Sequence, residues 1–492
     1  MWSAINLLLQ RIDEFVWGVP LMVLILCGGL LLTVKLNFLQ FFKLPLALKW
    51  MFHNEAEGEG EVSSFAALCT ALSATIGTGN IVGVATAVGA GGPGAVFWII
   101  AAAFFGMATK YAEGLLAVKY RSVDPETGHA LGGPFYYIEK GMGTSWKWLA
   151  KMFAFFGVCV GLFGIGTFSQ VNGISSAVKN FFDPNSAHLV TIPGVGSYSI
   201  SVVIASIVLS LCVGLVLIGG LKRISQVSQI VVPFMAVIYI LSVVVLIICN
   251  ISKVPEAVAT IIAGAFNPRA VTGGAIGSMI IVMQKGIARG IFSNEAGLGS
   301  APIAAAAAQT KEPVCQGLVS MTGTFIDTIV ICTMTGISIV LTGAWQVKGL
   351  EGVEVTSYAF AKGLPFSAQV SAFILMICLV FFAFTTILGW DYYSERCLEY
   401  LTGGNKKPLK VFRYLYILAV FVGPYLTVSA VWTIADIFNG LMAIPNMIAI
   451  FALNGVVVKE TKDFFAAKKD IEIRRRKYTI YDLIYRKQKR IF

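Results

Sequence analysis

The chain has 492 residues, of which 57% are hydrophobic and 13% are charged, whereas a soluble domain carries about 25% charged residues. This composition excludes an ordinary soluble enzyme and indicates a protein that crosses a membrane many times. The net charge is +11, but in a membrane protein the positions of the basic residues matter more than their sum, so nucleic acid is not an expected partner.

Several apolar runs reach or approach the ~20 residues that a membrane-spanning helix needs. We therefore predict an all-α polytopic membrane protein with eleven transmembrane helices. The predicted spans are Val16–Leu36, Phe65–Val88, Val96–Val118, Trp148–Ala177, Ser199–Ile218, Ile230–Cys249, Gly273–Ala308, Val314–Leu341, Phe366–Trp390, Phe412–Trp432 and Ile434–Val458.

The lysines and arginines concentrate in alternate loops and in the C-terminal tail. Because cytoplasmic loops carry the basic excess, we expect the N-terminus outside and the C-terminus in the cytoplasm. Residues 1–458 then form one transmembrane domain, and residues 459–492 form a basic tail that serves as an anchor on the lipid bilayer or as a regulatory element. Hydrolase, metal and nucleotide motifs are missing from the sequence, so we expect no enzyme activity and no organic cofactor.

The second span contains the segment Ala74–Gly83, which combines glycines, threonines and an asparagine in an apolar setting. A glycine inside a helix costs about 0.5–1 kcal/mol relative to alanine, and non-helical backbone at membrane depth survives only beside protein or a water-filled cavity. We therefore predict a helix that breaks at Gly77 and Gly79. Free amides of Thr78, Gly79 and Asn80 at this break would favour a carboxylate.

The carbonyls before this break, around Ser73 and Ile76, would point the other way and suit a small cation. The alternative is that the small residues only permit close helix packing. Further along, Lys110 and Glu113 are three residues apart near a cytoplasmic helix end, where we expect a pair that reaches the membrane surface. On the fourth span, Gln170 shares a face with two glycines, and it could reach either a neighbouring helix or a ligand.

A second interrupted span, Gly286–Pro302, contains several glycines together with charged and polar residues. It follows the first by five spans, an odd number, so the units that begin with these two spans have opposite orientations in the membrane. We predict inverted repeats of residues 63–250 and 255–458, with residues 16–36 as an extra N-terminal helix. Paired broken helices in such halves are typical of secondary transporters and mark their binding site.

Charged residues at the second break are costly at membrane depth unless they are paired or hydrated. Lys285 and Arg289 lie one turn apart with Glu295 nearby, so we predict an ion pair that pins the broken helix or acts as a gate. We expect other residues of the segment to line a substrate pocket rather than only to pack: Gly290, Phe292, Ser293 and Asn294.

Later spans carry three further candidates. Asp327 stands alone among apolar residues and is either a proton or cation site or a hydrogen-bonded structural acid. Thr385 and Thr386 offer adjacent hydroxyls which, with a carbonyl opened near Phe382, would suit Na⁺; alternatively, each threonine bonds to its own helix. Trp390 lies one turn after Thr386 and is expected to close the side-chain end of the pocket.

Four segments resemble the alanine/glycine:cation symporter family, which includes the bacterial and archaeal sodium:alanine symporters. These are Ala74–Gly83, Gly91–Gly94, Gly132–Tyr137 and Arg289–Pro302. The last is long enough to be highly specific, and the resemblance covers nearly the whole chain. It implies the leucine-transporter type of 5+5 inverted repeat, Na⁺ as coupling ion with H⁺ in some members, and a small neutral amino acid as cargo.

The resemblance also implies roles for individual residues. The substrate residues would include Thr78, Gly79, Asn80, Gln170, Phe292, Ser293 and Trp390. The cation would lie near Ser73, Ile76, Phe382, Thr385 and Thr386. We expect a monomeric Na⁺-coupled alanine or glycine symporter of the bacterial inner membrane; the alternatives are glutamine as cargo, H⁺ as coupling ion, and an ion channel, since glycine-rich breaks also build filters.

Overall fold

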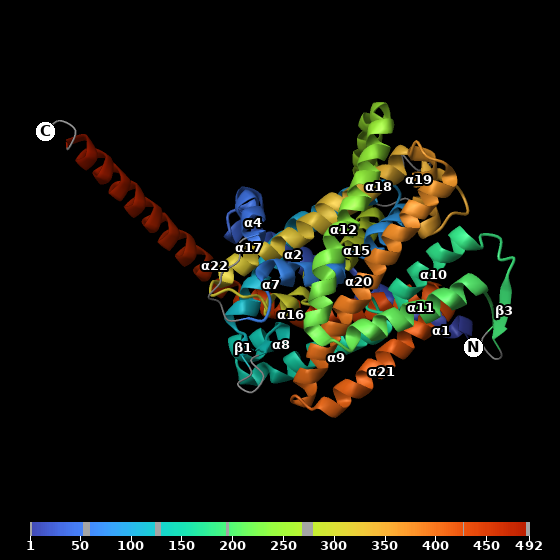
Figure 1. The fold of residues 1–492 in the computed structure, drawn as a ribbon, viewed down its shortest axis with the longest axis horizontal. Helices are drawn as coiled ribbons and strands as arrows, with labels where there is room; N and C mark the ends of the chain where they lie inside the picture. The colour runs from blue at the N-terminus through green and yellow to red at the C-terminus, as the bar shows by residue number, and fades with distance from the viewer. Residues whose placement is uncertain are drawn as a thin grey trace.

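A computed structural model describes residues 2–52, 60–123, 129–192, 196–267, 279–426 and 428–488. Within these ranges the protein is almost entirely helical (Figure 1). The first half contains α1 Trp2–Val16, α2 Val19–Lys35, α3 Leu39–Phe42, α4 Leu44–Met51, α5 Ser64–Thr75, α6 Val84–Gly91, α7 Ala95–Lys119, α8 Pro134–Tyr136, α9 Lys147–Phe163, α10 Phe168–Phe182, α11 Ile200–Leu217 and α12 Gly220–Cys249.

The second half follows the same pattern of long helices joined by short turns. It contains α13 Val254–Phe266, α15 Met279–Asn294, α16 Ala301–Ala305, α17 Pro313–Thr324, α18 Thr333–Leu341, α19 Val353–Gly363, α20 Ala368–Thr402, α21 Lys406–Val422 and α22 Val428–Gln488. π-Helical turns occupy Gly79–Gly83, Tyr137–Gly141 and Phe325–Cys332, and 3₁₀ turns occupy Thr144–Trp146, Ile251–Lys253, Ala344–Gln346 and Gly423–Tyr425.

The β-structure in the described ranges consists of two short antiparallel hairpins and an isolated parallel bridge between Val62 and Ala308. β1 (Ser122–Val123) pairs with β2 (Ala130–Leu131), and β3 (Leu189–Ile192) pairs with β4 (Gly196–Ser199). Both hairpins connect helices and lie outside the helical core, so the fold class is all-α, as predicted.

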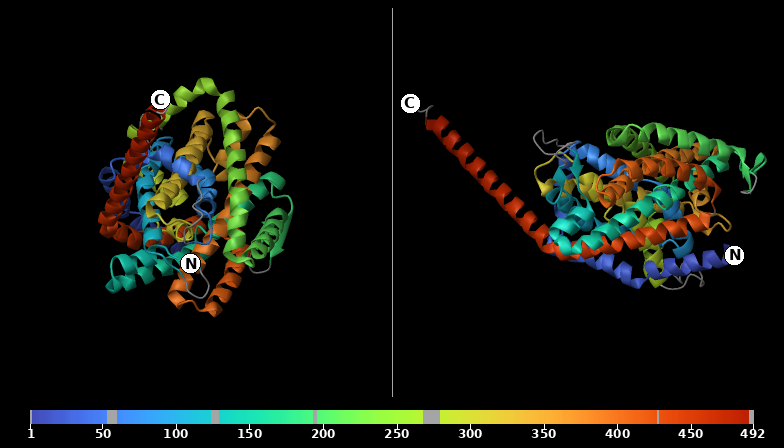
Figure 2. Two further views of the ribbon diagram at one scale, coloured as in Figure 1. Left: turned by 60° about the vertical axis from the view of Figure 1, so that its left-hand side comes forward. Right: turned by 90° about the horizontal axis from the view of Figure 1, so that it is seen from below.

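Apolar side chains cover the outside of the bundle, where a soluble protein would place polar ones. On α12, which runs along the outside in Figure 2, exposed side chains recur every three or four residues: Ile230, Phe234, Val237, Leu241, Val244 and Ile248. A continuous apolar stripe of this kind is stable against lipid and not against water. The molecule is therefore a multi-pass membrane protein.

Eight helices in the described ranges are long and apolar enough to span a membrane, or nine if α5 and α6 together form one bent span. The predicted number of eleven stays a prediction. The predicted tenth span corresponds to α21, which has 17 residues, and the fourth is divided between α9 and α10. Residues 273–278 of the predicted seventh span lie outside the described residues.

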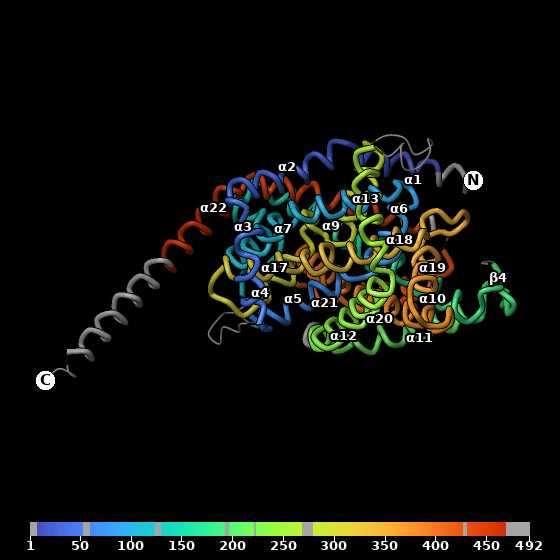
Figure 3. Tube along the Cα trace, turned by 90° about the horizontal axis from the view of Figure 1, so that it is seen from above, coloured from blue at the N-terminus to red at the C-terminus, as the bar shows by residue number. Residues whose placement is uncertain are grey.

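The interior of the bundle is organised around α7, which packs against α15 and α17, while α5 packs against α12 and α20. The π-helical segment Gly79–Gly83, which follows α5, contacts α15, α19 and the π-helical segment Phe325–Cys332. α22 packs along α1, α2 and α9 and then continues beyond the bundle as a single long helix toward the C-terminus (Figures 1 and 3).

Candidate functional site

The two halves of the first broken helix, α5 and the segment Gly79–Gly91, meet at an angle of 52°. In the break, the amide of Gly77 donates to Asn80 Oδ1 at 2.8 Å, and the amide of Thr78 donates to Gln170 Oε1 at 2.9 Å. The predicted break is confirmed. These two amides are bound to side chains rather than free as predicted for Thr78, because a buried N–H without an acceptor is costly.

Gln170 reaches the break from the start of α10, and its own amide group donates to Ile165 O at 3.0 Å. Ile165 belongs to a non-helical link between α9 and α10, in which Gly166 O accepts from Tyr416 Oη at 2.9 Å. This link falls inside the predicted continuous span Trp148–Ala177. The structure therefore adds a third irregular backbone segment beside the first break.

Asp327 connects the two broken helices. Its Oδ1 accepts from Asn80 Nδ2 at 2.7 Å, and its Oδ2 accepts from Ser293 Oγ at 2.9 Å and from Thr328 Oγ1 at 2.6 Å. The residue is fully buried in the π-helical segment between α17 and α18. These contacts agree with the predicted hydrogen-bonded acid, and they bring a carboxylate directly between the two breaks.

The two breaks also touch through their backbones. A β-carbon at Gly79 would lie 3.1 Å from Ser293 Cα and 3.3 Å from the Phe292 ring. Gly290 behaves differently from its predicted role in the pocket: a β-carbon there would lie 3.3 Å from Ile99 Cα, so this glycine allows α15 to pack closely on α7.

The predicted cation residues come together between the end of α5 and the middle of α20. Thr386 Oγ1 lies 3.2 Å from Ile76 O and 3.0 Å from Phe382 O, and Thr385 Oγ1 lies 3.0 Å from the same Phe382 O. Ser73 lies one turn before Ile76, where the last carbonyls of α5 lose their helical partners. Such a set of oxygen atoms suits a hard cation.

α20 is a continuous helix from Ala368 to Thr402, so the prediction of a carbonyl opened near Phe382 is wrong. The hydroxyls of Thr385 and Thr386 donate to carbonyls of their own helix, and the helix therefore stays intact beside them. The carbonyl that reaches these hydroxyls from outside α20 is Ile76 O, which belongs to the break after α5.

The second break follows α15 and is also confirmed. Glu295, Gly297 and Gly299 have φ values of 56°, 89° and 80°, a left-handed conformation that is uncommon for a residue with a side chain. The Glu295 carboxylate is held by Trp390 Nε1 at 2.8 Å and by the Ser300 hydroxyl. Trp390, fully buried, thus supports the second break directly.

Glu113 holds the backbone of the same break from α7. Its Oε1 accepts from the amide of Gly297 at 3.2 Å and from Asn446 Nδ2 at 2.7 Å, and Asn446 Nδ2 also donates to Gly297 O at 2.9 Å. Lys110 and Glu113 are 3% and 0% exposed. The predicted pair at the membrane surface is therefore wrong, because Glu113 serves the broken backbone instead.

Arg289 has a different partner from the predicted one. Its guanidinium forms two hydrogen bonds with Asp436, Nη1–Oδ1 at 3.1 Å and Nη2–Oδ2 at 2.6 Å. It also lies 5.1 Å from the ring of Trp432, whose ring packs 5.0 Å from that of Phe292. The predicted pair with Glu295 is therefore wrong: the ion pair of Arg289 joins the broken helix to α22, and the Glu295 carboxylate accepts from Trp390 and Ser300 instead.

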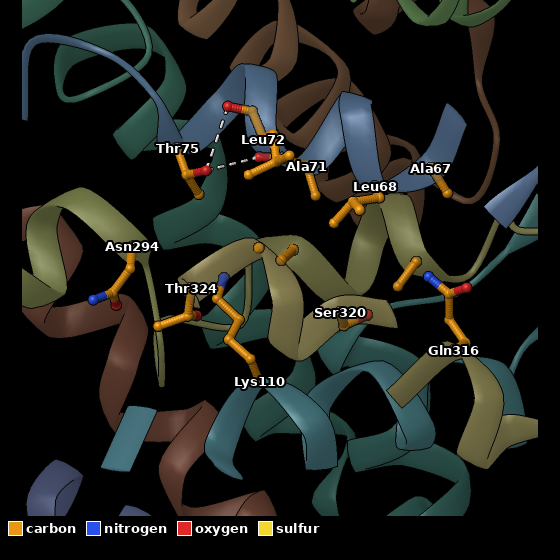
Figure 4. A pocket seen from close by; sticks show the side chains of 13 residues that line it. Ala67, Leu68, Ala71, Leu72, Thr75, Lys110, Asn294, Gln316, Ser320 and Thr324 are labelled. Atoms are coloured by element: carbon orange, nitrogen blue, oxygen red, sulfur yellow. Dashed lines mark hydrogen bonds between the residues drawn. The ribbon is translucent and has the colours of Figure 1, made fainter. Parts of the chain in front are cut away.

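A small cavity of about 20 Å³ adjoins the ends of both broken helices (Figure 4). Thr75 of α5, Asn294 of α15, Lys110 and Thr324 are among its lining residues. Lys110 Nζ and Thr324 Oγ1 make no hydrogen bond within the described part of the chain. A space of this size and polarity fits about one water molecule.

Three functional candidates on α22 were not found from the sequence. Asp436 and Asn446 are isolated polar residues in an apolar span, and that isolation at membrane depth is the signal that could have identified them. Trp432 gave no signal, because tryptophan is also common where a helix meets the membrane surface.

Two helices that break at membrane depth, with their breaks in contact and paired by buried polar side chains, define a membrane transporter. The chain belongs to the sodium:alanine symporter family, whose model matches residues 2–477. The members of this family are transporters and not enzymes.

Several relatives match over almost their full lengths. An uncharacterized transporter of Haemophilus influenzae is 55% identical over 94% of this chain and 96% of the relative. The sodium/alanine symporter AgcS of Methanococcus maripaludis is 46% identical over 94% of this chain and 98% of the relative. The probable sodium/glutamine symporter GlnT of Bacillus subtilis is 36% identical over 93% of this chain and 90% of the relative.

A solved structure shares the fold. MhsT, crystallised in complex with L-phenylalanine, superposes with a TM-score of 0.54 at 14% identity, covering 82% of this chain and 93% of that chain. At this identity the likeness establishes the fold alone, which is that of the leucine-transporter type.

The hydrogen bond from Trp390 to Glu295 predicts a stability effect. Trp390→Phe removes the donor and leaves a buried carboxylate oxygen unpaired, so it should destabilise the protein by about 1–3 kcal/mol. Thermal unfolding in detergent measures this. Tyr393→Phe is the matched control, because the Tyr393 hydroxyl is buried without a partner in the described part of the chain. Equal unfolding temperatures for the two variants would contradict the assigned contact.

Proposed function

We propose that this protein carries alanine or glycine together with Na⁺ into the cell by alternating access. It acts as a monomer without an organic cofactor in the bacterial inner membrane, with the N-terminus outside. Its eleven spans comprise an extra N-terminal helix and a 5+5 inverted repeat of residues 63–250 and 255–458. Family membership and the paired broken helices support this proposal.

The cargo carboxylate binds at the first break, to amides of Thr78, Gly79 and Asn80. The observation that carries this assignment is that the Thr78 amide already holds an oxygen acceptor, Gln170 Oε1, at 2.9 Å. The cargo carboxylate would replace the neutral Gln170 Oε1 as the acceptor of this amide. A charged acceptor makes a stronger hydrogen bond than a neutral one. The Gln170 side chain would then bind either the ligand or a backbone group of the link that contains Ile165.

The rest of the cargo faces the second break. Phe292 and Ser293 contact the Gly79 position, and Ser293 donates to Asp327, so this place suits a ligand whose ammonium group needs a nearby negative charge. Asn294 ends α15 at the same point. Trp390 closes the part of the pocket that holds the side chain of the cargo. The remaining space then fits a methyl group and little more.

The Na⁺ site lies at Ser73, Ile76, Phe382, Thr385 and Thr386. Inward movement of one Na⁺ supplies ~2.3 kcal/mol per 100 mV, and a tenfold Na⁺ gradient adds ~1.4 kcal/mol. Together these support an amino-acid gradient of several hundredfold, which is adequate for nutrient uptake.

The direct test is uptake of labelled amino acids into proteoliposomes with Na⁺, K⁺ and H⁺ gradients imposed separately. We expect saturable uptake of alanine and glycine that requires the Na⁺ gradient. Glutamine is the alternative cargo, as the name of the relative GlnT indicates for that protein, and H⁺ is the alternative ion because Asp327 offers a buried carboxylate. Uptake that does not saturate or counter-exchange would indicate a channel.

Gly79→Val should abolish uptake, because a β-carbon at this position would lie 3.1 Å from Ser293 Cα and a branched side chain would force the breaks apart. Membrane expression should stay near that of the parent. Gly89→Val is the control, since no atom lies within 4 Å of a β-carbon there. Normal uptake by Gly79→Val would contradict the proposal that the first break forms part of the substrate site.

Thr386→Val deletes the hydroxyl that lies between Ile76 O and Phe382 O, so it should raise the Na⁺ concentration for half-maximal uptake by about tenfold, the equivalent of ~1.4 kcal/mol. Thr385→Val should have a smaller effect, because this hydroxyl contacts its own helix and Met235. Unchanged Na⁺ dependence in both variants would mean that the cation binds elsewhere.

A further inference from the structure

α22 leaves the bundle beside α2 and α3 (Figure 3). A basic groove lies there, between α22 and the segment that joins α2 to α3. Its volume is about 430 Å³, within the range of about 300–1,000 Å³ for small-molecule sites. Three lysines line it, Lys35 and Lys43 from one wall and Lys462 from the other. None of its lining residues belongs to the two breaks or to the proposed transport site.

The positive charge of the groove is not neutralised by the protein. Within the described residues none of the three lysines forms an ion pair, and no carboxylate is among the lining residues. Lys35 Nζ donates to the neutral Asn454 Oδ1, and Lys43 Nζ lies 4.8 Å from the Phe465 ring. By contrast, Lys119 on neighbouring α7 pairs with Glu460 at 2.7 Å.

Apolar surface continues from the groove along the outside of the bundle. Leu30 and Val34, one turn apart on α2, are 47% and 56% exposed, and Phe42 at the groove itself is 67% exposed. Lys35 ends α2, so the lysines lie where the apolar stripe stops. A positive groove above an exposed apolar stripe matches a molecule with an anionic head and hydrocarbon chains.

We propose that this groove binds the phosphate headgroup of an anionic phospholipid, whose acyl chains lie along α2. Basic clusters at a membrane boundary attract anionic lipid by about 1 kcal/mol per lysine, and the aromatic ring of Phe42 and the leucines of the wall exclude water from the bound glycerol region. Free inorganic phosphate has the same anionic group as the lipid headgroup, but it has no hydrocarbon chain to cover the apolar stripe on α2. The lipid joins the extra N-terminal helix to the base of the C-terminal tail.

The test is native mass spectrometry of the full-length protein, purified in detergent and mixed with phosphatidylglycerol or phosphatidylcholine. We expect phosphatidylglycerol to bind at least tenfold more tightly. The double variant Lys43→Gln and Lys462→Gln should weaken phosphatidylglycerol binding by roughly 25-fold, about fivefold for each lysine, and should leave phosphatidylcholine binding unchanged.

The control variant is Lys406→Gln with Lys407→Gln, which removes the same charge from exposed positions at the start of α21. It should bind phosphatidylglycerol as the parent does. Equal weakening in the control would reduce the effect to net charge and overturn the proposal. Displacement of phosphatidylglycerol by millimolar inorganic phosphate, or equal binding of both lipids, would overturn it as well, because the site would then recognise an anion or a hydrocarbon chain alone.

Discussion

A break in a membrane helix leaves backbone N–H and C=O groups that must be paired by protein, and this constraint organises the whole centre of the molecule. At the first break the partners are Asn80 and Gln170, and at the second they are Glu113 and Asn446. Asn80 belongs to the first break itself, but Gln170, Glu113 and Asn446 come from other helices, so those helices must lie beside the breaks. The bundle is built around its two irregular segments.

The same constraint explains why so many charged groups are buried. Glu113, Glu295 and Asp327 are fully buried, and each accepts at least two hydrogen bonds from neutral donors. Carboxylates accept several donors at once, which suits them to irregular backbone better than a neutral amide. Transport by alternating access would require the contacts between the breaks to separate, and the Asp327 hydrogen bonds are those that join one broken helix to the other.

Both breaks could be predicted from the sequence, because glycine clusters and polar residues in apolar spans have a direct physical cause, whereas the family followed from the resemblance of its motifs. The resemblance placed Ile76, Phe382, Thr385 and Thr386 near one cation, and these residues do lie in contact. Prediction from the sequence failed for partners, since spacing along one helix says nothing about another helix: Arg289 pairs with Asp436, 147 positions away. It also failed at Phe382, where hydroxyls satisfied the carbonyl and α20 stayed continuous.

The length of α22 has a mechanical consequence. The helix runs unbroken for 61 residues, and it carries Asp436 and Asn446 near one end and the tail at the other, with Pro445 between them. Beyond Pro445 the helix stays in contact with α7, since Tyr111 bonds to Thr461 and Lys119 pairs with Glu460. The stretch from Asn446 to Thr461 is about 22 Å long at 1.5 Å per residue. α22 is thus a rigid strut, and a shift of it beside the breaks would be transmitted to the far end of α7.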